Sequence, residues 1–167
     1  MSRFASEMPV LYVEPWVSLN SLRKHHSGLL RILKDIRKPV ARKISANLSV
    51  MTTSAARPVS GSRQLMPFTQ RRWLEGIRRA ARSAGIEHPI LWVSRPEMGF
   101  AIGQLGEQFS IYHIVDEYSG YTGLTDRHKS GLTEQEADVF GKVDLTVAAS
   151  PELVAAKAGP GRDIVLL

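Results

Sequence analysis

The stretch SIYHIVDEYSGYTGL, residues 110–124, joins an apolar run to two adjacent carboxylates and then to a segment rich in Tyr, Gly and Ser. Its first part has the β-branched and aromatic composition of a buried strand, predicted over 110–116. Asp116 and Glu117 follow the last apolar residue of that strand. Ligands of open parallel sheets bind beyond the carboxyl ends of the strands, so the two acids are candidates for an active site.

Strands and helices alternate on both sides of this stretch. Short apolar runs predict strands at residues 88–94, 110–116, 144–150 and 162–167. Helices are predicted between them over 96–106, 132–143 and 150–159, with Ser94, Thr133 and Ser150 at their starts. Repeated strand–helix–strand units with short connections indicate an α/β fold, a Rossmann-like parallel sheet flanked by helices.

The first half follows the same plan less regularly. Strands are predicted at 9–15 and 47–54, a loop at 56–68, and helices at 18–36 and 69–86. The second of these helices would bury Trp73, Ile77, Ala80 and Ala84 and end at Gly85. No boundary interrupts the pattern, so residues 1–167 are expected to form a single domain.

Composition narrows the class of protein. Hydrophobic residues make up 43% and charged residues 23% of the 167, as in ordinary soluble globular domains. Without Cys there are no disulfides and no Cys-ligated metals, which fits a cytoplasmic location. The pair His25-His26 lacks further ligands at suitable spacing, and no phosphate-cradling Gly-rich motif occurs, so neither a metal nor a bound cofactor is expected.

The charge is divided unevenly along the chain. Residues 1–82 carry 16 Lys/Arg and four Asp/Glu, whereas residues 83–167 carry six and twelve. A basic half of this kind suits an anionic partner, although a solvated basic surface without a partner is the alternative. The basic residues interleave with Leu and Ile over 22–43, which favours an anionic membrane over nucleic acid, because no aromatic platform accompanies them. The membrane- or anion-binding candidates are Arg23, Lys24, Arg31, Lys34, Arg37, Lys38, Arg42 and Lys43.

Two roles remain open for the acids that end the strand at 110–116. A carboxylate at this position can act as a general base toward an acceptor hydroxyl. Alternatively, one acid caps the following loop and the other is solvated. Spacing alone does not decide between these roles.

Four separated segments, RFASEMPVLYVEPWVSL, PILWVSRPEMG, YHIVDEYSGYTGL and VDLTVAASPELVAAKAGPGRDIVLL, resemble the N-terminal domain of bacterial GT-B glycosyltransferases of the group 1 type. Their order along the chain also matches, while residues 20–70 match only in patches. The nearest resemblance is to cell-envelope and exopolysaccharide enzymes. The resemblance implies the acceptor-binding half of a two-domain enzyme that transfers sugar from a nucleotide-sugar to a polysaccharide or lipid-linked acceptor.

The resemblance also assigns residues. Asp116 matches the first acid of the family's mid-domain motif, and becomes the candidate general base or acceptor ligand. Glu117 replaces the family's second Asp. Tyr118, Ser119, Arg95 and Glu97 would line the same rim and bind substrate.

Departures from the family bear on activity. The family's first strand and its C-terminal donor domain have no counterpart in the chain, so the chain alone is expected to be inactive. A nucleotide-sugar would bind only with that second domain present. The basic N-terminal half would allow peripheral contact with the inner face of the plasma membrane. The alternative function is a non-catalytic fragment or split subunit that binds anionic membrane, with nucleic acid less favoured.

Overall fold

A computed structural model describes residues 2–14, 40–52 and 66–167 of the chain. These residues form two compact units, Met1–Glu87 and His88–Leu167. Each unit contains its own sheet and is described by itself.

The second unit is built on four parallel strands, in the spatial order β4-β5-β6-β7. Their bounds are β4 Ile90–Val93, β5 Phe109–Ile114, β6 Leu145–Ala148 and β7 Ile164–Leu166. The register pairs Ile90 with Phe109, Ile111 with Leu145 and Thr146 with Ile164. All four strands lie where the apolar runs predicted them, because strands covered by helices need continuous apolar sequence.

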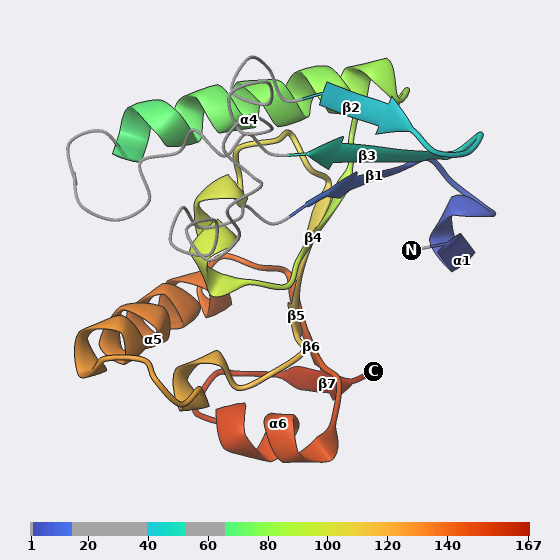
Figure 1. Cartoon of the computed structure of the whole chain (residues 1–167). Helices are drawn as coiled ribbons and strands as arrows, with labels where there is room; N and C mark the ends of the chain where they lie inside the picture. The colour runs from blue at the N-terminus through green and yellow to red at the C-terminus, as the bar shows by residue number, and fades with distance from the viewer. Residues whose placement is uncertain (1, 15–39, 53–65) are drawn as a thin grey trace. The chain divides into compact units, whose positions relative to one another are not determined.

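Helical segments connect these strands: η1 Pro96–Ala101, η2 Tyr118–Gly120, α5 Asp126–Phe140 and α6 Pro151–Lys157. Figure 1 shows the sheet edge-on, with α5 on one side of it and α6 beside β7. Between sheet and helices lies a core in which Tyr112, Ile114 and Val139 are fully buried. Full burial of an aliphatic side chain such as Ile114 or Val139 stabilises a fold by about 2 kcal/mol.

The first unit contains a three-stranded sheet in the order β1-β3-β2 and one long helix. Strands β1 Val10–Val13 and β3 Leu48–Thr52 are parallel, and β2 Val40–Lys43 pairs antiparallel with β3. Helix α1 Ser2–Ala5 precedes β1, and α4 Met66–Ser83 buries Leu74, Ile77 and Ala80. Strand β2 was not predicted, since its sequence, VARK, belongs to the basic stretch at 22–43.

Helix α4 ends at Ser83, and the predicted stop residue Gly85 lies in the cap that follows it. The amide of Ile86 donates to the carbonyl of Ala81, and that of Gly85 donates to Arg82. These two hydrogen bonds require a residue in the left-handed conformation just after the helix. Gly85 supplies it, with φ +74°. Two of the expected buried residues, Trp73 and Ala84, are only half-buried, and Leu74 is buried instead.

Helix α5 begins seven residues before the predicted start at Thr133. Thr125 is the N-cap, and its side chain accepts a hydrogen bond from the amide of His128, while Asp126 supplies an acid in the first turn. Thr133 lies inside the helix, where its hydroxyl donates to the carbonyl of Lys129. The prediction placed 117–131 in a loop, yet Gly131 lies within the helix.

The helix predicted over 96–106 is also shorter than expected. It is a 3₁₀ helix of six residues, η1, and Arg95 rather than Ser94 occupies its N-cap without a side-chain cap bond. After Ala101 the chain leaves the helix, with Ile102 extended and Gly103 at φ +76°. Close packing explains the glycine inside it, because a Cβ at Gly99 would lie 2.5 Å from Cγ2 of the buried Val139 on α5.

We therefore expect Gly99→Ala to lower the free energy of unfolding by about 2 kcal/mol, because α5 must shift to relieve the contact. Gly131→Ala is the matched control: no atom lies within 4 Å of the new Cβ, and replacing a helical Gly should stabilise by about 0.5–1 kcal/mol. Urea unfolding of the two variants measures both values. Equal effects of the two substitutions would contradict the packing described for Gly99.

Candidate functional site

The predicted site residues gather at one edge of the sheet of the second unit. Arg95 and Glu97 follow β4, and Asp116 and Glu117 follow β5. Because β4 and β5 are parallel, both pairs lie at the carboxyl ends of neighbouring strands. The structure thus brings together segments that are about twenty residues apart in sequence.

Asp116 is the exposed carboxylate of this edge. Its Oδ1 accepts a hydrogen bond from the amide of Glu117 at 2.8 Å, and its Oδ2 accepts one from the hydroxyl of Tyr121. The bond to Asp116 raises the pKa of the Tyr121 phenol. Tyr121 was not among the predicted site residues, although it lies in the Tyr/Gly-rich segment that follows the two acids.

Tyr118 connects the two strand ends. Its hydroxyl donates to the carbonyl oxygen of Ser94 at 3.1 Å, directly after β4. Its ring packs edge-to-face against Tyr121, with centroids 5.9 Å apart, and the Arg95 guanidinium lies 5.7 Å from the ring centroid. Partial burial raises the pKa of the Tyr118 phenol.

Arg95 and Glu97 form a two-bond ion pair at the rim. Nη2 of Arg95 lies 2.7 Å from Oε1 of Glu97, and Nε lies 3.4 Å from Oε2. The hydrogen bonds to Glu97 outweigh partial burial and raise the pKa of Arg95. The guanidinium is therefore already engaged by a carboxylate.

Glu117 faces the interior of the unit rather than the rim. Nζ of Lys157 lies 2.7 Å from Oε2 of Glu117 and 2.7 Å from Oε2 of Glu136 on α5. Ser119 donates to Oε1 of Glu117 through its hydroxyl at 2.5 Å, and Tyr112 donates to Oε1 of Glu136 at 2.9 Å. We call these five residues the Lys157 network.

The pKa shifts agree with this arrangement. Burial opposes the charged form of Lys157, but its bonds to the two glutamates prevail and raise its pKa. Burial likewise disfavours the Glu117 carboxylate, yet Lys157 and Ser119 hold its pKa below the ordinary value. For Tyr112, burial and the neighbouring Glu136 both raise the pKa of the phenol. Sequence reasoning missed Lys157, Glu136 and Tyr112, because nothing local marks residues that meet only after folding.

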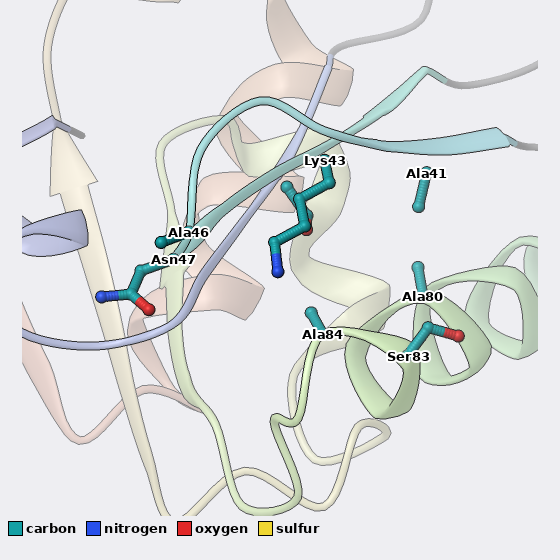
Figure 2. A pocket seen from close by; sticks show the side chains of 8 residues that line it. Ala41, Lys43, Ala46, Asn47, Ala80, Ser83 and Ala84 are labelled. Atoms are coloured by element: carbon teal, nitrogen blue, oxygen red, sulfur yellow. The ribbon is translucent and has the colours of Figure 1, made fainter.

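The first unit contains a cavity of about 160 Å³ between the β2–β3 hairpin and the last turns of α4. Its walls include Ala41, Ala80 and Ala84, and Figure 2 shows Lys43 extending from β2 toward Ala84. Arg42 and Lys43 are both exposed. The other predicted membrane-binding residues, from Arg23 to Lys38, lie outside the described residues.

The described ranges, 2–14, 40–52 and 66–167, contain neither a membrane-spanning helix nor a cluster of metal-binding side chains. No helix there is long and apolar enough to cross a bilayer. No three His, Asp or Glu side chains in these ranges are grouped as a metal ion would require.

Removing the buried cation tests the Lys157 network. Lys157→Met leaves Glu117 and Glu136 without their shared partner, and we expect the free energy of unfolding at pH 7 to fall by about 3 kcal/mol. Lys142→Met is the control: Lys142 follows α5 and its partner Asp138, in the last turn of that helix, is exposed, so the expected loss is below about 0.5 kcal/mol. Urea unfolding measures both variants.

The same variant has a pH signature. The lowered pKa of Glu117 means that its bond to Lys157 stabilises the wild type above the ordinary pKa of 4.5 and is lost as the pH falls through the lower, folded-state value. The difference between wild type and Lys157→Met should therefore shrink between pH 7 and about pH 3. A difference that stays constant over this range would show that Glu117 does not depend on Lys157 for its charge.

No protein-family model and no curated protein matches the chain. Among solved structures, the chain is similar to a sucrose-phosphate synthase from Thermosynechococcus elongatus, with a TM-score of 0.52 and 11% sequence identity. The match covers 95% of this chain and 86% of that chain. At this identity the likeness concerns the fold alone, and it confirms the predicted class: an α/β fold with a four-stranded parallel sheet and flanking helices.

Proposed function

We propose that this chain is the acceptor-binding domain of a glycosyltransferase, which acts with a nucleotide-sugar on a cell-surface polysaccharide or lipid-linked acceptor. The observation that carries the proposal is the exposed Asp116 carboxylate at the carboxyl edge of β5, in a fold that resembles a GT-B domain. That edge is where open parallel sheets bind their ligands.

Asp116 is the candidate general base. Its Oδ2 already accepts a hydrogen bond from a hydroxyl, that of Tyr121. An acceptor hydroxyl that also donates to this carboxylate would pass its proton to Asp116 while its oxygen forms the new bond to the anomeric carbon and the nucleotide phosphate leaves. Glu117 is less suited to this step, because Lys157 and Ser119 bind its carboxylate.

The remaining predicted rim residues would position the acceptor. Tyr118 joins the ends of β4 and β5, and Arg95 with Glu97 forms a fixed polar pair beside it. Ser119 acts through Glu117, to which it donates two hydrogen bonds. The donor would require a second, nucleotide-sugar-binding domain, which makes acceptor binding the function to test on this chain.

We expect short neutral glycans such as cellobiose and maltose to shift the backbone amide signals of Ser94, Arg95, Glu97 and residues 116–121 in a titration of the ¹⁵N-labelled chain. Asp116→Asn should weaken binding about tenfold, because a hydrogen bond to a charged group is worth roughly 1.5 kcal/mol or more. Asp163→Asn removes an equal charge just before β7, at the opposite edge of the sheet, and should leave binding unchanged. If no glycan shifts these signals while the chain is folded, the proposal that this edge binds an acceptor is wrong.

A second candidate function, peripheral binding to anionic membrane, rests on the first unit. Arg42 on β2 and the outer residues of α4, including Arg79 and Arg82, are exposed. Each basic residue near an anionic surface contributes about 1 kcal/mol. A surface of this kind could hold the domain close to a lipid-linked acceptor.

Sedimentation with phosphatidylserine vesicles tests this candidate. The double variant Arg79→Gln/Arg82→Gln should lose about thirtyfold in partitioning, equivalent to about 2 kcal/mol, and binding of the wild type should weaken with salt. The control Arg127→Gln/Lys129→Gln removes two charges from α5 in the second unit and should have little effect. Salt-independent partitioning, or equal effects of both double variants, would contradict the proposed surface.

A further inference from the structure

The rim at the carboxyl edge combines an aromatic ring with a carboxylate, and both are open to solvent. Tyr121 is 46% exposed, and Asp116 beside it is exposed as well. Two contacts hold the ring of Tyr121 in place: the hydrogen bond from its hydroxyl to Asp116 and the edge-to-face packing against Tyr118. Tyr118 is in turn bound to the carbonyl oxygen of Ser94. The aromatic surface is thus held from both strand ends before any ligand arrives.

The charges around this surface do not balance. Two cations, Arg95 and Lys157, are joined through the contacts described above to four carboxylates, which gives the cluster a formal charge of −2. The four carboxylates belong to Glu97, Asp116, Glu117 and Glu136. Both cations are already paired, Arg95 with Glu97 and Lys157 with two glutamates. Among the described contacts, Asp116 has hydroxyl and amide donors but no cation.

We propose that this rim selects a pyranose that is neutral or carries an amine and rejects sugars that bear a carboxylate or a phosphate. The selected pyranose stacks on Tyr121 and donates hydrogen bonds from its hydroxyl groups to Asp116. The proposal rests on the proposed function and specifies its acceptor. One face of a pyranose presents C–H groups, which pack against an aromatic ring, while its edge presents hydroxyl donors. A carboxylate accepts about four hydrogen bonds, and Asp116 uses two, so acceptor capacity remains.

The main objection to this selectivity is Arg95, the residue best suited to bind an anionic sugar. Its guanidinium forms both bonds of a fork with Glu97. A sugar carboxylate could use only the guanidinium N–H groups that Glu97 leaves over, and it would then lie near Asp116 and Glu97 without a second cation to offset it. Like charges placed together in a partly desolvated site oppose binding, so discrimination against anionic sugars follows from the pairing of Arg95.

The test titrates the ¹⁵N-labelled chain with methyl β-glucopyranoside, methyl β-glucosaminide and methyl β-glucuronide, which share one ring and differ in charge. Amide signals of residues 116–121 report binding. We expect the glucuronide to bind at least tenfold more weakly than the glucoside, and the glucosaminide at least as tightly. Asp116→Asn should narrow the gap between glucuronide and glucoside to a few-fold, whereas Asp163→Asn, at the opposite edge of the sheet, should leave it unchanged.

Two variants of Tyr121 test the stacking surface. Tyr121→Ala should weaken the glucoside and the glucosaminide about tenfold, while Tyr121→Phe retains the ring and most of the affinity. Dispersed amide spectra confirm that each variant is folded. Glucuronide binding as tight as that of the glucoside would overturn the proposed selectivity. Full affinity in Tyr121→Ala would overturn the proposed stacking. Either result leaves acceptor binding intact. If none of the three sugars shifts the signals, this inference and the proposed function fail together.

Discussion

Lys157 is the residue on which the functional edge of the second unit depends. It is buried, and its ammonium group joins Glu117, at the start of the η2 turn, to Glu136 on α5. A buried ammonium is costly to desolvate, so it persists only where partners compensate it, and here two carboxylates do so. The same three charges connect β5, α5 and α6, and through Glu117 they fix the short turn that presents Asp116, Tyr118 and Tyr121.

This arrangement divides the two adjacent acids between different tasks. Glu117 is directed inward and becomes part of the framework, whereas Asp116 is directed outward and keeps its carboxylate accessible. The sequence left open whether one acid caps a loop while the other serves a ligand. In the structure Glu117 accepts the hydrogen bonds of the following turn, from both the amide and the hydroxyl of Ser119. Asp116 also accepts a bond from its neighbour's amide, and its role toward a substrate remains the proposal made above.

What could be predicted from the sequence depended on how local the determining interaction is. The strands of the second unit were predictable because each is a continuous apolar run, and α6 because Ser150 and Pro151 mark its start within two residues. The predicted start of α5 at Thr133 is too late, because Thr125 and Asp126 supply the cap and the first-turn acid inside the segment that was predicted as a loop. The Lys157 network lay beyond such reasoning, since Glu117 and Lys157 are 40 residues apart and only the folded chain brings them together. The resemblance to a family supplied Asp116, but it gave no indication of Tyr121.

The strand order of the second unit has a consequence for how it assembles. Every strand pairs with the strand that precedes it along the chain, so the sheet can grow one strand at a time as the polypeptide leaves the ribosome. Lys157, at the end of α6, follows β4, β5 and β6 along the chain. Until α6 docks, Glu117 and Glu136 lack their cation, and the η2 turn is not yet fixed. We therefore expect amide hydrogens of the turn to gain protection from exchange later in folding than those of β4 and β5, so that these two strands pair before the functional edge of the sheet is fixed.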